Sequence, residues 1–356
     1  MTDDEAAPSR CGALPRAVLT VACLMTVGSR APASAQASAM PPWSDPSPHR
    51  VARVTVAPDV QLEVLDWGGP TRGGSGPALV FLAGLGNTAH VFDAFAPRFR
   101  DRFHVYGITR RGNGASSAPD SGYDAATRAR DVVTVLDSLH LGRAVLIGHS
   151  IAGDELSKIA VTYPQRVRAL VYLDAYDNGP ARREAMRAIV APRGLAPPVT
   201  PGDSVSPAAV AAFYGRMLGG KYPESEARAT FVFGPDGHLQ ADGPGEKSWP
   251  KVSAGTEASA YKKINAPTLG VFAIYPGGTT EFFPGVDFAH LGDSTRAAAA
   301  RYFTEMTAWE QTNRNRIRAE LPRAVLVELP HAGHYVFLTQ PDRVEREIRR
   351  FLGQVH

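Results

Sequence analysis

The sequence predicts an α/β fold in which helices pack on both faces of a doubly wound, mostly parallel sheet. The prediction depends on two observations. Short runs of continuous apolar residues, which are typical of strands buried on both faces, alternate with amphipathic segments that are long enough to form helices. This alternation extends over most of the chain and contains no internal repeat. Strands that alternate with helices favour βαβ units, and therefore a parallel sheet.

Composition and charge exclude several classes of function. The 356 residues are 44% hydrophobic and 21% charged, as in an ordinary globular protein. The net charge is only +3 and no run of lysine or arginine occurs, so no nucleic-acid partner is expected. After the N-terminal segment no run reaches the roughly eighteen apolar residues that a membrane span needs, so no stable membrane insertion is expected either.

The N-terminal segment has the pattern of a secretory signal. Arg10 and Arg16 precede an apolar run over residues 17–28, and the small residues within 31–37 suit cleavage by a signal peptidase. The apolar run is too short to span a membrane. We therefore expect residues 1–37 to be a signal peptide that is removed, and the mature protein to be secreted or periplasmic.

The rest of the chain is expected to form a single domain after a short linker. Residues 38–49 are rich in proline and serine and predict a flexible lead-in, which is followed by one domain over residues 50–356. Within that domain, residues 175–262 interrupt the alternation of strands and helices and are rich in proline, glycine and alanine. Both cysteines, Cys11 and Cys23, lie in the signal, so the mature chain is expected to contain neither a disulfide nor a cysteine-bound metal.

Each element of the fold is predicted from its own local pattern. Residues 51–56 and 61–66 alternate with a period of two around Pro58-Asp59, which indicates a hairpin. Continuous apolar runs predict buried strands, and apolar residues at helical spacing predict helices. The remaining expected elements, in chain order, are strand 78–82, helix 90–99, strand 104–108, helix 123–139, strand 144–147, a helix through 155–160, strand 167–173, strand 267–274, helix 294–321, strand 324–328 and helix 342–352.

A serine stands at the turn from a buried strand into a helix. The apolar residues 144–147 lead into Gly148-His149-Ser150-Ile151-Ala152, and Gly153 and a helical pattern follow. In so tight a turn only small side chains fit around the serine, and the strained backbone holds the hydroxyl of Ser150 out of the sheet. The alternative is an ordinary strand-to-helix turn in which Ser150 caps the helix.

The serine turn and the order of elements resemble those of the α/β-hydrolase superfamily. The pentapeptide is similar to the family's nucleophile elbow, G-x-S-x-G, except that the last glycine is displaced to Gly153. The segment Arg111–Ser116 and a late histidine also stand where the family has them, and residues 175–262 stand where the family inserts a lid. The resemblance implies a serine hydrolase with Ser150 as nucleophile and with its acid and histidine following in that chain order.

The resemblance indicates which histidine completes the site. His334 follows Gly333 and precedes an aromatic residue after the last predicted strand, which matches the position of the family's catalytic histidine. His331, three residues earlier, is the competing candidate. A serine hydroxyl is a weak nucleophile, so it needs such an imidazole to accept its proton.

The acid of the site is harder to assign. The family usually places it after the seventh strand, but here that strand has no carboxylate after it until Glu281. Asp174 instead ends the sixth strand, as the acid does in certain haloalkane dehalogenases, and we expect it to orient His334. Asp177 and Glu281 remain alternatives, and Asp174 could also merely cap the next element.

Two backbone N–H groups are expected to stabilise the oxyanion. By resemblance these belong to Ile151, directly after the nucleophile, and to Leu85 in the turn Ala83-Gly84-Leu85. The family has a histidine where this chain has Ala83, which does not affect a backbone donor. Three further charged residues are expected to make structural ion pairs only: Arg110, Arg111 and Asp131.

No cofactor and no metal is expected, because no His/Asp/Glu cluster has the spacing of metal ligands and no strand is followed by a phosphate-binding glycine pattern. The expected function is hydrolysis of a small-molecule carboxylic ester through an acyl-enzyme. Epoxide hydrolases and haloalkane dehalogenases use a carboxylate nucleophile, so Ser150 argues against both. Amidase, lactonase, thioesterase and carbon–carbon hydrolase share the triad and stay open, as does a non-catalytic relative that only binds a ligand.

Overall fold

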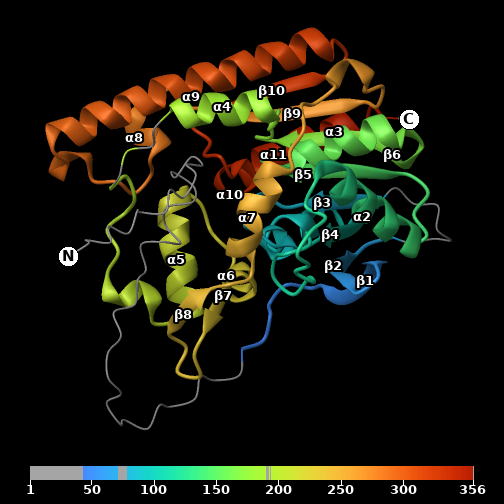
Figure 1. The fold of residues 1–356 in the computed structure, drawn as a ribbon, viewed down its shortest axis with the longest axis horizontal. Helices are drawn as coiled ribbons and strands as arrows, with labels where there is room; N and C mark the ends of the chain where they lie inside the picture. The colour runs from blue at the N-terminus through green and yellow to red at the C-terminus, as the bar shows by residue number, and fades with distance from the viewer. Residues whose placement is uncertain (1–42, 71–77, 190–191, 193, 356) are drawn as a thin grey trace, which may run out of the picture.

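The computed structural model describes residues 43–70, 78–189, 192 and 194–355. The predicted signal peptide, residues 1–37, lies outside the described residues, as do residues 38–42 of the predicted lead-in. Figure 1 shows one layered body in which helices cover both faces of a central sheet. Among the described residues, no helix combines the length and the apolar character that crossing a membrane requires.

The central sheet has eight strands in the order β1-β2-β4-β3-β5-β6-β9-β10 (Figure 1). The first two strands form the predicted hairpin and are antiparallel, and β2 is also antiparallel to β4. All the remaining pairs of neighbouring strands are parallel. The prediction of a doubly wound, mostly parallel sheet is therefore confirmed. The strand bounds are β1 Arg50–Ala57, β2 Val60–Gly68, β3 Ala78–Leu82, β4 His104–Ile108, β5 Ala144–His149, β6 Val167–Leu173, β9 Thr268–Ile274 and β10 Val325–Pro330.

The apolar strands are buried because both faces of the sheet are covered. All residues of β3, β4 and β5 are buried, which explains why their sequences are apolar runs rather than alternating patterns. One core cluster joins the sheet to α10 and α11, and a second joins it to α2, α3 and the end of α9. These helices span α2 Ala125–Ser138, α3 Ala152–Thr162, α9 Asp293–Glu320, α10 Val336–Thr339 and α11 Pro341–Leu352.

The helix predicted over residues 90–99 is wrong. The chain instead forms two short 3₁₀ turns, η1 Ala89–Phe92 and η2 Ala96–Phe99. Pro97 has no backbone N–H to donate to the carbonyl of residue 93, and it disfavours helical backbone in the residue before it, so an α-helix cannot continue through this point. The aromatic side chains Phe92, Phe95 and Phe99 are nevertheless buried on the sheet.

Residues 175–262 form a separate group of elements between β6 and β9, outside the central sheet (Figure 1). The described residues of this insertion contain a two-stranded antiparallel sheet and four α-helices. Another short helix, α8 Thr279–Phe282, follows β9. The bounds within the insertion are α4 Pro180–Ala188, α5 Pro207–Leu218, α6 Glu224–Thr230, β7 Phe231–Phe233, β8 Leu239–Asp242 and α7 Gly245–Ala254.

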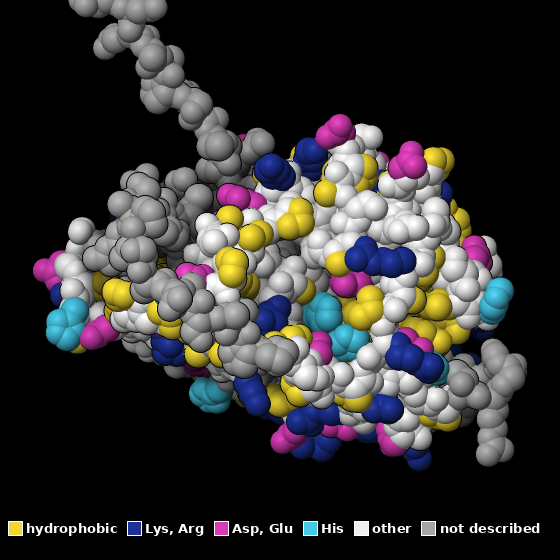
Figure 2. All heavy atoms as spheres, turned by 90° about the horizontal axis from the view of Figure 1, so that it is seen from below, with side chains coloured by type: hydrophobic (Ala, Val, Ile, Leu, Met, Phe, Trp, Pro, Cys, Tyr) yellow, Lys and Arg dark blue, Asp and Glu magenta, His cyan; other side chains and the backbone are white. Residues whose placement is uncertain are grey.

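Charged side chains of both signs are interspersed over the face shown in Figure 2, with hydrophobic side chains between them. Histidine side chains lie beside acidic ones near the centre of this face.

Candidate active site

Ser150 occupies a strained turn between β5 and α3. Its φ is +55°, in the left-handed region that non-glycine residues seldom adopt. The turn leaves no room for larger neighbours: a Cβ added to Gly148 would lie 2.9 Å from Cδ1 of Leu156, and one added to Gly153 would lie 3.1 Å from Cβ of Ala175. The small residues around the serine are therefore required by packing, as the sequence pattern predicts.

Ser150, His334 and Asp174 form one hydrogen-bonded chain. His334 Nε2 lies 3.0 Å from Ser150 Oγ, and His334 Nδ1 lies 2.6 Å from Asp174 Oδ2. With a carboxylate at Nδ1, the imidazole proton is assigned to that nitrogen, which leaves Nε2 free to accept the serine proton. This is the geometry that activates a serine hydroxyl as a nucleophile.

Asp174 has a rigid and buried position. Only 1% of the residue is exposed, and its φ of +44° turns the chain sharply after β6. Its Oδ1 accepts hydrogen bonds from the backbone N–H of Ala273, at 3.0 Å, and from the hydroxyl of Tyr176, at 3.3 Å. These donors hold the carboxylate so that Oδ2 faces the imidazole.

The competing candidates lie elsewhere. Asp177 accepts hydrogen bonds from the backbone N–H groups of Gly179 and Ser259, at 2.8 Å and 3.2 Å, and pairs with Arg316, so it fixes the chain after β6. Glu281 faces the other histidine: its Oε1 lies 3.3 Å from His331 Nδ1.

Leu85 and Ile151, the predicted sources of the oxyanion donors, lie together at the serine. Both line the same cavity as Ser150, and their side chains pack in one small apolar cluster with Tyr123 and Val252. The structure thus brings together the turn after β3 and the first residue after the serine, which is the arrangement that two converging backbone donors need.

A buried arginine connects the two parts of the predicted oxyanion site. Arg110 donates to the carbonyls of Ala83, at 2.8 Å, and Gly84, at 3.2 Å, directly before Leu85. The same guanidinium makes a bidentate pair with Glu155 of α3, at 2.6 and 2.7 Å. Bidentate pairs are geometrically specific, so Arg110 fixes the turn relative to the helix that follows the serine.

The other predicted structural ion pair is also present. Arg111 and Asp131 form a buried bidentate pair at 2.6 and 2.7 Å. It joins the loop after β4 to α2 and lies away from the cavity.

His149 is a site residue that the sequence analysis did not assign. It is fully buried, its Nε2 lies 3.1 Å from the carbonyl oxygen of His334, and its ring lies 4.7 Å from the ring of His334. Burial, together with the charge of the neighbouring His334, holds the pKa of His149 well below its ordinary value of 6.5. The ring is therefore neutral, and its Nε2 donates a hydrogen bond to the carbonyl oxygen of His334. No sequence signal marks this role, because the elbow pattern leaves that position free.

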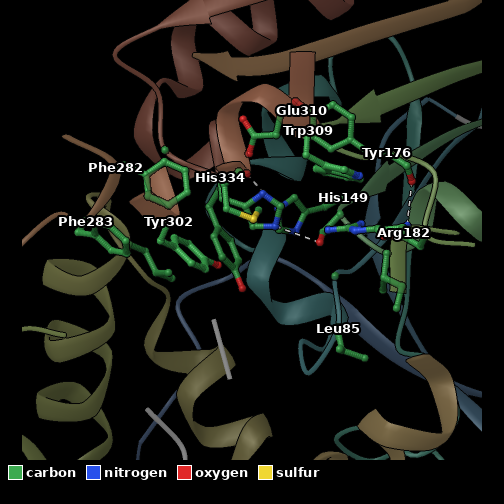
Figure 3. A pocket seen from close by; sticks show the side chains of 18 of the residues that line it. Leu85, His149, Tyr176, Arg182, Phe282, Phe283, Tyr302, Trp309, Glu310 and His334 are labelled. Carbon is green, nitrogen blue, oxygen red and sulfur yellow. Dashed lines mark hydrogen bonds between the residues drawn. The ribbon is translucent and has the colours of Figure 1, made fainter. Parts of the chain in front are cut away.

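The three linked side chains open into a cavity of about 250 Å³. Figure 3 shows aromatic side chains on two sides of His334: Phe282, Phe283 and Tyr302 on one side, and Tyr176 and Trp309 on the other. The walls come from the insertion, from α8 and from α9. A large apolar cavity with a few convergent polar groups is typical of a small-molecule site.

Arg182 and Glu310 place two ionisable groups in the wall of this apolar cavity (Figure 3). The guanidinium of Arg182 lies over the ring of Trp309, 4.4 Å from its centroid. Burial and the charge of Asp174 raise the pKa of Glu310 well above its ordinary value. The raised pKa favours the neutral form of Glu310, so Arg182 is the member of this pair that can offer a charged contact.

No group of side chains that line this cavity has the arrangement of a metal site. Elsewhere among the described residues, four side chains outside the cavity do have such an arrangement: Asp45, His49, His90 and Asp93.

Comparison with known proteins places the chain among enzymes of related fold. The model of the alpha/beta hydrolase family matches residues 79–347. The 2-(acetamidomethylene)succinate hydrolase of Mesorhizobium japonicum (strain LMG 29417 / CECT 9101 / MAFF 303099) is 26% identical over 289 residues, which are 78% of this chain and 89% of that protein. Bifunctional epoxide hydrolase 2 of Sus scrofa is 34% identical over 143 residues, which are 39% of this chain but only 25% of that protein.

Solved structures share the same architecture. The crystal structure of E-2-(acetamidomethylene)succinate hydrolase superposes with a TM-score of 0.58 and 21% identity, over 86% of this chain and 99% of that chain. At this level of identity the likeness shows a common fold.

Proposed function

The chain belongs to the alpha/beta hydrolase family, and we propose that it is a serine hydrolase that cleaves carboxylic esters through an acyl-enzyme. One observation carries the proposal: His334 bridges Ser150 Oγ, at 3.0 Å, and Asp174 Oδ2, at 2.6 Å. Binding alone needs no such bridge, whereas nucleophilic catalysis does.

The mechanism follows from this geometry. Ser150 Oγ attacks the ester carbonyl while His334 Nε2 accepts its proton, and Asp174 stabilises the resulting imidazolium. The backbone N–H groups of Ile151 and Leu85 stabilise the negative oxygen of the tetrahedral intermediate. His334 then returns the proton to the leaving alcohol. A water molecule, deprotonated by the same nitrogen, hydrolyses the acyl-enzyme and releases the acid.

We assign the role of a lid to residues 175–262. Leu195, Met217 and Trp249 of this insertion line the cavity, so they are placed to contact a bound substrate. Trp249 also packs closely against Gly86, the residue after Leu85: a Cβ added to Gly86 would lie 2.5 Å from the ring of Trp249. The apolar lining supports an ester with a hydrophobic acyl or alcohol group.

Amide hydrolysis is the second candidate. It is favoured by the relative that matches 78% of the chain, whose named substrate contains an acetamido group. The same triad cleaves amides if the leaving nitrogen receives a proton from His334. Epoxide opening has less support, because Ser150 stands where a carboxylate nucleophile is needed.

Steady-state kinetics on matched esters and anilides test these alternatives. p-Nitrophenyl esters of increasing chain length should be hydrolysed with a higher kcat/KM than the p-nitroanilides of the same acids. Ser150→Ala should lose activity toward both, by a factor on the order of 10⁴ to 10⁶ in kcat. A higher kcat/KM for the anilides would favour the amidase, and unchanged ester hydrolysis by Ser150→Ala would refute the mechanism.

Export is a separate part of the proposal. The basic residues Arg10 and Arg16, the apolar run 17–28 and the small residues after it support secretion with removal of residues 1–37. Mass spectrometry of the N-terminus from a secreting host tests this idea. A start near residue 38 is expected, and a cytoplasmic protein with residues 1–37 retained would contradict it.

A further inference from the structure

Two histidines and two aspartates converge outside the catalytic cavity. Asp45 and His49 lie just before β1, and His90 and Asp93 lie in and directly after η1. His90 Nδ1 is 2.9 Å from Asp93 Oδ2 and 4.0 Å from Asp45 Oδ2. His49 lies 3.7 Å from Asp45 Oδ2 through Nε2 and 3.1 Å from Asp93 Oδ1 through Nδ1. One possible ligand atom from each residue lies within 4.8 Å of all the others.

We propose that Asp45, His49, His90 and Asp93 bind one divalent transition-metal ion, with Zn²⁺ as the best fit. Two imidazole nitrogens and two carboxylate oxygens form a four-ligand set of the kind that zinc accepts in tetrahedral sites. Metal–ligand bonds of about 2.0–2.2 Å place tetrahedral ligands about 3.3–3.6 Å apart. With one ligand atom from each residue, the four atoms lie within 4.8 Å of one another, so the side chains must move inward by about an ångström to close the site.

The groups behind the four ligands give independent support. His90 directs its second nitrogen, Nε2, toward Glu63 Oε1 at 3.9 Å, and Glu63 is itself held by the hydroxyl of Thr109 at 2.7 Å. A carboxylate behind a ligating histidine is the usual outer partner in protein metal sites, because it orients the ring and increases its basicity. The hydrogen bonds within the cluster do not require Glu63 at that place.

Asp93 is oriented in the same way. Trp67 Nε1 donates to its Oδ1 at 3.0 Å, and Ser225 Oγ donates to its Oδ2 at 2.6 Å. The hydroxyl of Ser47 also donates to Oδ1, at 2.9 Å, so that oxygen is fully used. Oδ2 keeps a lone pair for a metal and is therefore the ligand atom we assign to Asp93.

Burial and access also suit a bound ion. The side chains of His49 and Asp93 are 5% and 4% exposed, whereas that of Asp45 is 24% exposed and provides a route to solvent. Glu63, Asp45 and Asp93 carry three negative charges against two imidazoles, so a divalent cation would offset part of an excess that burial makes unfavourable.

The rival arrangement is a metal-free ion cluster. In it, a hydrogen bond of 2.9 Å joins His90 Nδ1 to Asp93 Oδ2, and Glu63 Oε1 lies 3.9 Å from His90 Nε2. The ring can then lie between the two carboxylates with no metal bound.

A bound ion would act structurally rather than in the chemistry. It would join the segment before β1 to η1. That 3₁₀ turn begins four residues after Leu85, the predicted source of one oxyanion donor. None of the four ligands lines the catalytic cavity. The inference is therefore independent of the ester hydrolase proposal.

The test uses the full mature protein, stripped of metal with a chelator and then desalted. Titration calorimetry with ZnCl₂ should give one site per chain, and elemental analysis after desalting should retain one zinc per chain. Zinc at about 100 times Kd should raise the unfolding midpoint by roughly 3–6 °C. Asp45→Asn and His49→Gln should each weaken zinc binding at least tenfold, and His49→Gln should abolish the rise in midpoint.

The matched control is His290→Gln, which removes an exposed histidine that pairs with a nearby aspartate in the same way, with Nδ1 of His290 2.6 Å from Asp287 Oδ2. It should bind zinc like the unchanged protein. Asp45→Asn alters the most exposed ligand and should leave the fold intact, which circular dichroism can verify. The proposal is overturned if the unchanged protein binds no zinc, or if Asp45→Asn and His49→Gln bind it as tightly as His290→Gln does. Either result would leave the metal-free ion cluster.

Discussion

Replacing Asp174 with asparagine tests how the structure orients His334. Oδ1 of Asp174 accepts the N–H of Ala273, so the asparagine carbonyl oxygen would keep that place and its NH₂ group would face His334 Nδ1. An NH₂ group can only donate, so Nδ1 must become the acceptor and the proton must move to Nε2. In that tautomer Nε2 cannot accept the proton of Ser150.

The expected loss is therefore large. Asp174→Asn should lower kcat by roughly 10³ to 10⁴, which corresponds to about 4–5.5 kcal/mol of transition-state stabilisation, with little change in KM. Stopped assays with a p-nitrophenyl ester at several pH values measure kcat, and thermal unfolding measures whether the fold is retained.

Two matched substitutions separate orientation from a general loss of charge. Glu281→Gln should lower kcat less than about tenfold, because Glu281 faces His331. Asp177→Asn should also change kcat less than about tenfold, and it should mainly lower the unfolding midpoint, because Asp177 pairs with Arg316. The reasoning would be refuted if Asp174→Asn kept near-normal kcat, or if Glu281→Gln showed the larger loss.

Three further predictions concern neighbouring groups. His149→Phe should lower kcat by about 10- to 100-fold in ester assays, because it removes the donor to the His334 carbonyl; unchanged kcat would contradict this positioning role. Arg182→Met should raise KM for esters with a carboxylate in the acyl group by about tenfold or more, and leave neutral esters unaffected; an equal effect on both would contradict the cationic contact. Burial raises the pKa of Glu226 from 4.5 to about 7, so its ionisation opposes folding, and stability should fall by on the order of 3 kcal/mol as the pH rises from about 4.5 to 7. The free energy of unfolding, measured with urea at several pH values across that range, should change less with pH in Glu226→Gln than in the unchanged protein. The same dependence on pH in both would contradict the assignment.

The parts of the fold that depend on local pattern could be predicted from sequence. Buried parallel strands are apolar over their whole length, so β3, β5 and β6 are visible as runs of residues. The turn at Ser150 is visible for a similar reason, because the close packing around Gly148 admits only small residues. The helix expected over residues 90–99 does not form, because Pro97 interrupts the backbone hydrogen bonding although the apolar spacing continues across it.

What the sequence could not determine depends on contacts between distant segments. Asp174 and Glu281 were both possible partners of His334, and the choice depends on which strand end lies beside the histidine loop. The structure places Asp174 there, although its catalytic role stays a prediction until it is measured. His149 was missed because its partner is a backbone carbonyl 185 residues away.

The cluster around His90 shows the same limit. Asp45 and His49 are separated from His90 and Asp93 by the first three strands, and neither pair alone has the spacing of a known metal motif. Only the packing of the segment before β1 against η1 brings the four side chains together.

The central claim is that Ser150 is the nucleophile, and covalent labelling tests it most directly. The protein should be treated with a fluorophosphonate and the modified residue located by peptide mass spectrometry, with Ser253→Ala as a control that removes another serine lining the cavity. The account predicts one adduct per chain on Ser150 in the unchanged protein and in Ser253→Ala, and no adduct with Ser150→Ala. An adduct on another residue, or labelling that persists in Ser150→Ala, would contradict it.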